Sequence, residues 1–240
     1  MGATSGMGRL VAEGLLREGW KVGVAGRRAA LLAEIEAAYP GSVVTEVVDV
    51  TAPDAPEALL KLIGKLGGMD LYFHSTGVGN QNRELDVKLE EKMMLTNAYG
   101  FSRMIDTAFN WFKDNGIPGQ IAAISSIAGF KGMSNAAAYS ATKRFQWTYL
   151  QALSQLSRSQ KLGISFTELR PGFVATDFIH YKYPMEMKPE YVARQILKAV
   201  RHKKRTRIID WRYRILCFFW QLIPGCIWER IKLPAQKERA

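Results

Sequence analysis

The sequence predicts a single α/β domain built around a doubly wound parallel sheet. Short apolar runs alternate along the chain with stretches whose apolar residues recur at helical spacing, which is the pattern of repeated strand-helix units. A cluster of glycines at residues 2–8 runs directly into one of these helices, as expected where the backbone must turn tightly. Together these two observations favour a sheet whose strands are joined by helices.

Each predicted element follows from one of these patterns. We expect strands at residues 21–25, 43–48, 69–73, 119–124, 164–169 and 207–209. Helices are expected at residues 9–16, 28–38, 56–66, 89–112 and 190–201, and another helix carries Tyr139 and runs to about residue 159. We assign residues 1–210 to the domain and residues 211–240 to an aromatic and basic C-terminal tail.

The composition excludes several classes of protein. With 240 residues, 48% of them hydrophobic, the chain can bury a substantial core. Its two cysteines, Cys217 and Cys226, form no disulfide framework or zinc pattern. The three histidines, His74, His180 and His202, are scattered, so we predict no metal site. We expect a reducing, cytoplasmic location, since we recognise no secretory signal and no apolar stretch of the ~18–20 residues that a membrane span needs.

The net charge of +11 is concentrated late in the chain, at residues 194–214 and 232–239. A surplus of this kind favours an anionic partner or surface. Nucleic acid is not expected, because no helix-turn-helix, zinc-finger or RNA-binding signature accompanies the basic residues. Cofactor phosphates and lipid headgroups fit the distribution better.

The glycine cluster reads Gly2-Ala3-Thr4-Ser5-Gly6-Met7-Gly8. In such a loop, backbone N–H groups can approach a pyrophosphate, which then lies at the positive end of the helix dipole. An ordinary glycine turn is the alternative, and the strand-helix alternation that follows argues against it. A buried strand normally precedes this loop, yet only Met1 precedes Gly2. We therefore expect translation to begin upstream and to supply a strand of about five to eight residues.

The strand at residues 21–25 is followed by Gly26-Arg27-Arg28, at the place where an acidic residue would bind a ribose 2′-hydroxyl. A guanidinium fork there suits a 2′-phosphate, which favours NADP over NAD. We assign this contact to Arg27, because Arg28 more readily opens the exposed face of the next helix.

Further polar or small residues follow the ends of two more strands, where ligands gather in open α/β sheets. We place Asp49 and Gly77 at this ligand-binding edge on this ground. From spacing alone, a simple turn role for Asp49 is supported almost as well.

Tyr139 and Lys143 lie four residues apart on an expected helix, so a phenol and an ammonium share one face. A neighbouring cation stabilises a phenolate and lowers a pKa that is ordinarily near ~10. A lysine stem packed on a half-buried tyrosine would produce the same spacing. The serines that end the strand at residues 119–124, Ser125 and Ser126, favour the chemical interpretation. Asn97 falls inside the long helix, where an amide usually faces solvent.

In combination these residues resemble the classical short-chain dehydrogenase/reductase family, whose fold is Rossmann-like. The resemblance covers residues 2–209, and its motifs occur in the family's order: Gly2-x-x-x-Gly6-x-Gly8, Asp49, Ser75-Thr76-Gly77, Asn97, Ser126, Tyr139-x-x-x-Lys143, and Pro171-Gly172 with Thr176. The family spacing selects Ser126 over Ser125 as the catalytic serine.

The resemblance implies a role for each motif. Tyr139 is the general acid/base, and Ser126 hydrogen-bonds the substrate oxygen. Lys143 lowers the pKa of Tyr139 and holds the nicotinamide ribose, while Asn97 orders a water in a proton relay. The implied contacts of NADP (NADPH) are Gly2, Thr4, Ser5, Gly6, Met7, Gly8, Arg27, Asp49, Val50, Gly77, Tyr139, Lys143, Pro171, Gly172 and Thr176.

Two features depart from the family or vary within it. His74-Ser75-Thr76-Gly77 stands where many members have Asn-Asn-Ala-Gly, so a backbone role survives there and a side-chain amide role does not. The substrate loop after Thr176, residues 177–185, is short and rich in aromatics. Its aromatics suggest a hydrophobic substrate, although packing within the loop explains them as well.

The tail at residues 211–224 combines tryptophans and arginines with an apolar run too short to span a bilayer. Two interpretations are equally supported. Residues 211–233 contact a membrane surface peripherally, or they pack on the domain or in a homo-oligomer interface, since dimers and tetramers are common in the family.

The expected function is that of an NADP(H)-dependent oxidoreductase. It would interconvert a ketone and a secondary alcohol, on a small-molecule substrate that is lipid-like or steroid-like. The alternative is an NADP(H)-binding regulatory protein of the same fold without turnover. A degenerate catalytic set would favour that alternative, whereas Asn97, Ser126, Tyr139 and Lys143 are all present.

Overall fold

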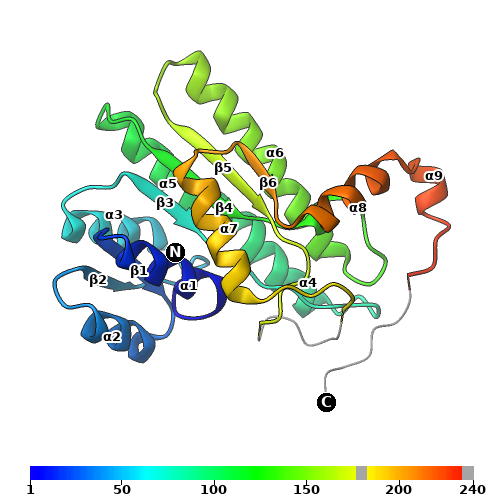
Figure 1. Cartoon of the computed structure of the whole chain (residues 1–240), viewed down its shortest axis with the longest axis horizontal. Helices are drawn as coiled ribbons and strands as arrows, with labels where there is room; N and C mark the ends of the chain where they lie inside the picture. The colour runs from blue at the N-terminus through cyan, green and yellow to red at the C-terminus, as the bar shows by residue number, and fades with distance from the viewer. Residues whose placement is uncertain (177–182, 234–240) are drawn as a thin grey trace.

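Parallel strands form the centre of the molecule (Figure 1). The structure is a computed structural model and describes residues 1–176 and 183–233. One group pairs β1 (Val22–Gly26) with β2 (Val43–Val47). The other pairs, in order, β3 (Leu71–His74), β4 (Gln120–Ile124), β5 (Ser165–Arg170) and β6 (Thr206–Ile208). Each of these pairings is parallel.

Helices cover both faces of these strands (Figure 1). On one face lie α1 (Gly6–Arg17), α2 (Ala29–Ala38) and α7 (Pro189–Arg201), and on the other lie α3 (Ala55–Leu66), α5 (Phe101–Asp114) and α6 (Ala137–Ser159). Side chains of α3, α5 and α6 share one buried cluster, while α1 and α7 share another. This arrangement confirms the predicted doubly wound α/β fold.

A short segment, Met1 to Ala3, lies between the carboxyl ends of β1 and β3. The Met1 amine donates to the Phe73 carbonyl at 2.8 Å, and the Ser75 N–H donates to the Met1 carbonyl at 3.0 Å. On the other side, the N–H groups of Gly2 and Ala3 both donate to the Ala25 carbonyl. The glycine loop is thereby fixed to both groups of strands. The strand expected upstream of Met1 stays a prediction.

The long helix predicted at residues 89–112 is divided by a π-helical segment. It consists of α4 (Val87–Met94), the π-helical η1 (Leu95–Gly100) and α5. Asn97 lies in η1 and is completely buried, so the expectation that its amide faces solvent is wrong. The wider turn directs this side chain inward, and such segments are frequent at functional sites.

Two helices of the tail extend away from the strands, α8 (Trp211–Leu222) and the short α9 (Gly225–Trp228) (Figure 1). Their inner side is attached to the domain. The Lys131 ammonium donates to the Ile223 carbonyl at 2.7 Å, and the Trp228 indole donates to the Gly132 carbonyl at 2.6 Å. Within residues 1–176 and 183–233, no helix has the length and apolar character needed to cross a bilayer.

Candidate active site

The two serines after β4 have different surroundings. Ser125 donates to Glu168 Oε1 at 2.9 Å and accepts from the Trp147 indole at 3.1 Å, so a buried network occupies its hydroxyl. Ser126 precedes the 3₁₀ helix η2 (Ile127–Phe130) as its N-cap, and its Oγ accepts from the Ala128 N–H at 3.1 Å. The Ser126 side chain also hydrogen-bonds Tyr139. Ser126 is therefore the serine that adjoins the tyrosine, while Ser125 supports the strand end beneath it.

Tyr139 and Lys143 lie on the first two turns of α6, with the Lys143 Nζ 5.6 Å from the centroid of the Tyr139 ring. Tyr139 is partly buried and Lys143 almost wholly buried. Helical spacing and the turn after β4 thus place a hydroxyl, a phenol and an ammonium side by side at the carboxyl edge of the strands.

Burial dominates the titration of this pair. It raises the pKa of Tyr139 to about 12, against the hydrogen bond with Ser126, which lowers it. Burial also lowers the pKa of Lys143 to about 8. The expected lowering of the phenol pKa by Lys143 is therefore not what the chain alone gives, because burial penalises the phenolate more than the Ser126 hydrogen bond stabilises it.

A side chain that sequence reasoning missed, Gln146, connects Lys143 to Asn97. The Lys143 ammonium donates to Gln146 Oε1 at 3.1 Å, and Gln146 Nε2 donates to the Asn97 carbonyl at 2.9 Å. Gln146 is completely buried. It thereby links the lysine ammonium on α6 to the backbone of η1.

The Asn97 amide group is itself fully engaged. Its Oδ1 accepts from the Val78 N–H at 2.8 Å, and its Nδ2 donates to the Val78 carbonyl at 2.7 Å and to Thr142 Oγ1 at 3.2 Å. These bonds tie η1 to the segment after β3 and to α6. The Asn97 side chain therefore positions three elements of the site, and its backbone carbonyl points toward Gln146.

The glycine loop fits a diphosphate. Ser5 is the N-cap of α1 but makes no side-chain cap bond, and the first turn of the helix holds no acid. Gly6 has φ +55° with open space where a side chain would begin, and a Cβ on Gly8 would overlap the carbonyl of Gly2. Thr4 and Ser5 lie in the same turn, and Met7 packs toward the core. Uncapped N–H groups at a helix start, approached closely by backbone, are what phosphate oxygens require.

The two arginines after β1 have different partners, and Arg28 opens α2 as its N-cap, as expected. Arg27 lies 3.9 Å from Asp49 Oδ2, in an exposed ion pair. Arg28 reaches back over the glycine loop and donates to Thr4 Oγ1 at 2.8 Å and to Ser5 Oγ. Arg28 thus lies over the glycine loop, and its guanidinium contacts residues of the loop directly.

Three more of the residues predicted to contact the cofactor follow the ends of β2 and β3. Asp49 Oδ1 accepts from the N–H and the hydroxyl of Thr51 at 3.0 and 2.8 Å, so Asp49 shapes the turn there as the alternative interpretation held. Val50 is buried beside Gly100. A Cβ on Gly77 would lie 3.3 Å from Asn97 Oδ1 and 3.5 Å from Lys143 Nζ, which places its backbone beside the catalytic candidates.

The segment after β5 closes the other side of the site. The Pro171 carbonyl accepts from the Ile127 N–H at 3.1 Å, and Gly172 lies against the ring of Tyr213 from α8. The Thr176 N–H bonds the Val174 carbonyl at 2.8 Å. Of the predicted substrate loop, residues 177–182 lie outside the described residues. Beyond them, Tyr183 stacks on Phe173 with 3.8 Å between the ring centroids.

His74, the departure noted before Gly77, is a core histidine. Its Nδ1 lies 2.9 Å from the Tyr72 hydroxyl, and the residue is completely buried. Burial, together with the positive charges of the N-terminus and Lys143, lowers its pKa to about 3. It therefore stays neutral beneath the site.

Known proteins resemble this chain in sequence and fold. The family described as short chain dehydrogenase matches residues 1–186. An uncharacterized oxidoreductase from Myxococcus xanthus is 34% identical over 182 residues, which are 73% of this chain and 71% of that protein. A 3-ketoacyl-(acyl-carrier-protein) reductase from Brucella melitensis, complexed with NADH, superposes with a TM-score of 0.77 at 20% identity, covering 87% of this chain and 94% of that one. An alcohol dehydrogenase from Thermococcus sibiricus, complexed with 5-hydroxy-NADP, has a TM-score of 0.76 at 20% identity, covering 87% and 93%.

Proposed function

The chain is an oxidoreductase of the short-chain dehydrogenase family, and we propose that it interconverts a ketone and a secondary alcohol with NADP(H) as cofactor. The observation that carries the proposal is the cluster of Ser126, Tyr139 and Lys143. The serine is hydrogen-bonded to the phenol, and the ammonium lies 5.6 Å from the phenol ring. A hydroxyl and a phenol at one point are what is needed to bind a carbonyl oxygen and to give it a proton.

The catalytic roles follow from these positions. Ser126 donates a hydrogen bond to the substrate oxygen and holds it against Tyr139. Tyr139 gives its proton to that oxygen in reduction and takes it back in oxidation. NADPH, when bound, supplies the hydride. Lys143 holds the nicotinamide ribose with its ammonium and, through Gln146, is connected to the Asn97 carbonyl.

The preference for NADP rests on Arg27 and Arg28. Both stand at the carboxyl end of β1, and Arg28 already contacts Thr4 and Ser5. A guanidinium pair at this place favours a 2′-phosphate. Solved structures of the same fold have been complexed with NADH or with 5-hydroxy-NADP, so the fold admits both cofactors and these side chains make the choice.

The substrate in this proposal is hydrophobic, lipid-like or steroid-like. Phe173, in the segment that follows β5, forms a stacked aromatic pair with Tyr183. Apolar walls of this kind bury an apolar ligand and leave its carbonyl for a few polar groups.

The decisive test replaces Tyr139 by Phe. NADPH affinity, measured by quenching of tryptophan fluorescence, should remain nearly unchanged, because the phenol oxygen is a minor part of the cofactor contacts. Reduction of ketones, screened from steroids to long-chain ketones, should fall by about 10²–10⁴. Tyr99→Phe is the matched control, since Tyr99 is exposed. Turnover retained by the Tyr139→Phe variant would refute the acid/base assignment.

The cofactor preference has its own test. Arg27→Asp and Arg28→Asp should each weaken NADPH binding by about 10–100-fold, since each loses a charge-assisted contact, and should spare NADH. Arg17→Asp, an exposed arginine at the far end of α1, is the control. If NADPH keeps its original margin over NADH in both variants, another residue recognises the 2′-phosphate.

A further inference from the structure

The helix α8 is apolar on two opposite faces. Its inner face carries Tyr213 and Cys217, both completely buried, and Trp220, whose ring lies 6.2 Å from that of Phe130. The Tyr213 hydroxyl donates to the Met185 carbonyl at 3.0 Å and accepts from the Phe173 N–H at 3.2 Å. These contacts attach the inner face of the helix to the domain and leave its outer face exposed.

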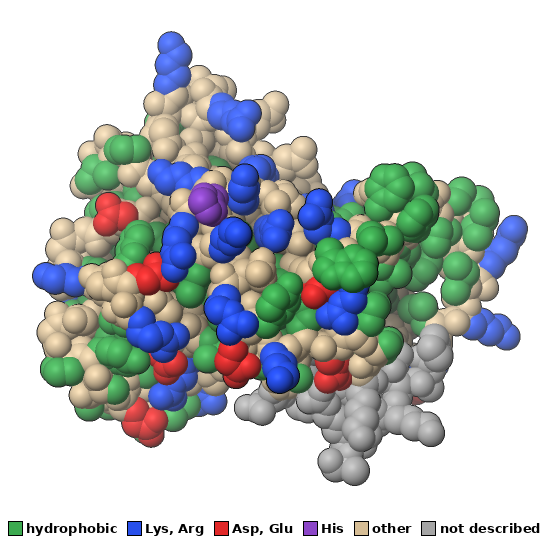
Figure 2. Space-filling model, in the orientation of Figure 1, with side chains coloured by type: hydrophobic (Ala, Val, Ile, Leu, Met, Phe, Trp, Pro, Cys, Tyr) green, Lys and Arg blue, Asp and Glu red, His purple; other side chains and the backbone are tan. Residues whose placement is uncertain are grey.

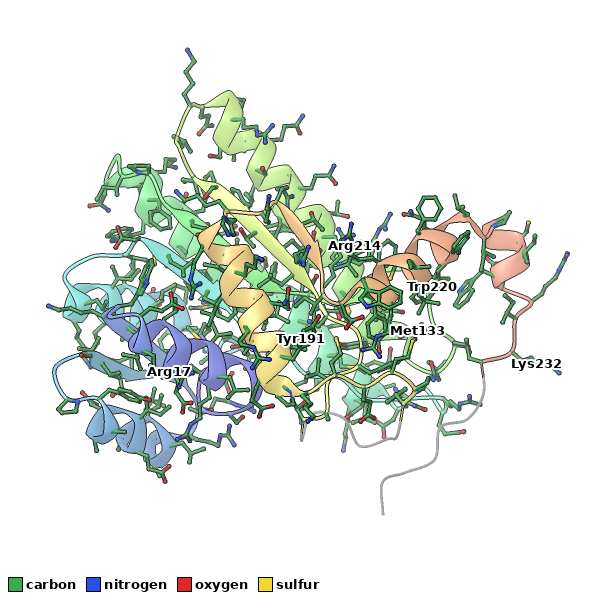
Figure 3. All side chains as sticks on the ribbon, viewed as in Figure 1. Arg17, Met133, Tyr191, Arg214, Trp220 and Lys232 are labelled. Atoms are coloured by element: carbon green, nitrogen blue, oxygen red, sulfur yellow. The ribbon has the colours of Figure 1, made fainter. Side chains whose placement is uncertain are left out.

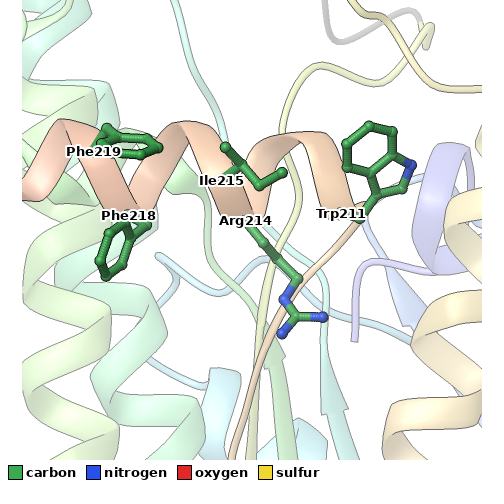
Figure 4. A pocket seen from close by; sticks show the side chains of 5 residues that line it. All are labelled: Trp211, Arg214, Ile215, Phe218 and Phe219. Atoms are coloured by element: carbon green, nitrogen blue, oxygen red, sulfur yellow. The ribbon is translucent and has the colours of Figure 1, made fainter.

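The outer face carries large apolar side chains at helical spacing. They are 51% to 64% exposed and comprise Trp211, Ile215, Phe218, Phe219 and Leu222. At 100° per residue, these positions lie opposite Tyr213 and Cys217. Trp211, Ile215, Phe218 and Phe219 line a shallow hollow together with Arg214 (Figure 4). We call these five apolar residues the outer face of α8.

The outer face of α8 presents its apolar side chains as one contiguous patch. Five such side chains, each a little more than half exposed, present on the order of 500 Å² of apolar surface to solvent. Single exposed apolar residues need no explanation, but a contiguous patch of several hundred Å² marks a site of contact with another body.

Positive charge lies next to the outer face, on the side of α7 and β6. Residues 188–233 hold twelve lysines and arginines but three acids. In Figure 2 the blue side chains gather over the face that carries α7 and β6, and the green side chains of α8 lie directly beside them. Arg214 borders the hollow itself, and Figure 3 shows Arg214 on α8 and Lys232 beyond α9.

This combination selects among occupants. In a two-fold dimer the same surface would meet itself, so the basic residues of both copies would oppose each other. An anionic bilayer attracts the cations and accepts the aromatic and aliphatic side chains together. We propose that the outer face of α8 is a peripheral attachment site for anionic lipid membranes, with α8 lying in the plane of the interface.

Co-sedimentation of the full-length protein with vesicles tests this proposal. The probes are phosphatidylcholine vesicles with and without phosphatidylserine, at low and at physiological salt. Binding should require phosphatidylserine and weaken with salt. Phe218→Ser/Phe219→Ser should lower the partition coefficient about tenfold or more, because each phenyl ring loses its burial in the acyl region. Arg214→Glu should lower it about tenfold on anionic vesicles.

The control is Leu60→Ser/Val87→Ser, which removes two exposed apolar side chains from α3 and α4 and should leave vesicle binding unchanged. Point substitutions are used because truncation before Tyr213 would also remove the contacts of the inner face. Equal binding by the Phe218→Ser/Phe219→Ser variant and the wild type would overturn the proposal. So would a wild-type protein that ignores vesicles while sedimenting as a dimer that the same two substitutions dissociate.

Discussion

The bridge through Gln146 allows a quantitative prediction. Gln146→Met keeps the length of the side chain and removes its acceptor for Lys143 and its donor to the Asn97 carbonyl. The other acceptor near the ammonium, the Ile124 carbonyl, lies at 3.5 Å. The buried ammonium loses a hydrogen bond to a charged group, worth about 1.5–3 kcal/mol, and a buried carbonyl is left unpaired at a further cost of about 1–3 kcal/mol. We expect the free energy of unfolding to fall by about 3–5 kcal/mol.

The same substitution shifts a titration. Burial already lowers the pKa of Lys143 to about 8, and loss of the Gln146 oxygen lowers it further, because that oxygen stabilises the charged form. NADPH affinity, if it depends on the Lys143 ammonium, should then decline at a lower pH than in the wild type. Gln146→Glu should move the decline to higher pH, since a carboxylate favours the ammonium more strongly than an amide does.

Urea unfolding and NADPH titrations across pH measure both effects without a known substrate. Gln155→Met, at an exposed position of the same helix, is the matched control. The reasoning fails if the pH profiles of the Met and Glu variants coincide with that of the wild type, because Gln146 would then only fill space.

The glycine loop and the pH dependence of stability give two more predictions. Gly8→Ala should abolish NADPH binding and lower the melting temperature, since its Cβ would overlap the Gly2 carbonyl. Gly6 has φ +55° and open space around it, so Gly6→Ala should lower the free energy of unfolding by only about 1–2 kcal/mol. Equal behaviour of the two variants in thermal unfolding would contradict the close packing of the loop. Burial lowers the pKa of Lys143 in the folded chain to about 8, from an ordinary value of 10.5. Between these two pH values the unfolded chain holds a proton on this lysine that the folded chain lacks. Raising the pH through this range therefore stabilises the folded state by up to ~3 kcal/mol through this group. Urea unfolding of the wild type and of Lys143→Met at pH 8 and pH 10 measures this effect. If the two proteins differ in free energy of unfolding by the same amount at both pH values, burial does not lower the pKa of Lys143.

Much of the fold could be predicted from the sequence because parallel strands impose a simple rule. The residues that follow each apolar strand must lie at one edge of the sheet, so Asp49, Gly77 and Ser126 could be assigned to that edge before any contact was known. Tyr139 and Lys143 share a helix, and their spacing alone put them side by side.

The features that sequence reasoning missed depend on contacts between distant elements. Nothing in the sequence of α6 marks Gln146, whose role arises where that helix crosses η1. The Asn97 side chain points inward because it lies in a π-helical turn, and the spacing of apolar residues in the sequence does not predict such a turn. Arg28 bends back over the glycine loop because two hydroxyls lie within its reach, and a helix-opening position gave no sign of this.

The inner face of α8 also affects the order in which parts of the protein fold during translation. Tyr213 and Trp220 are synthesised after every catalytic candidate, yet they support the loops on both sides of the substrate region, through Phe173 and Phe130 respectively. During translation the glycine loop and the strands after it can fold as they leave the ribosome. The two loops gain their packing contacts only after α8 has been synthesised. A ribosome-bound chain that ends before Tyr213 would therefore acquire a nucleotide-binding half while its substrate side was still incomplete.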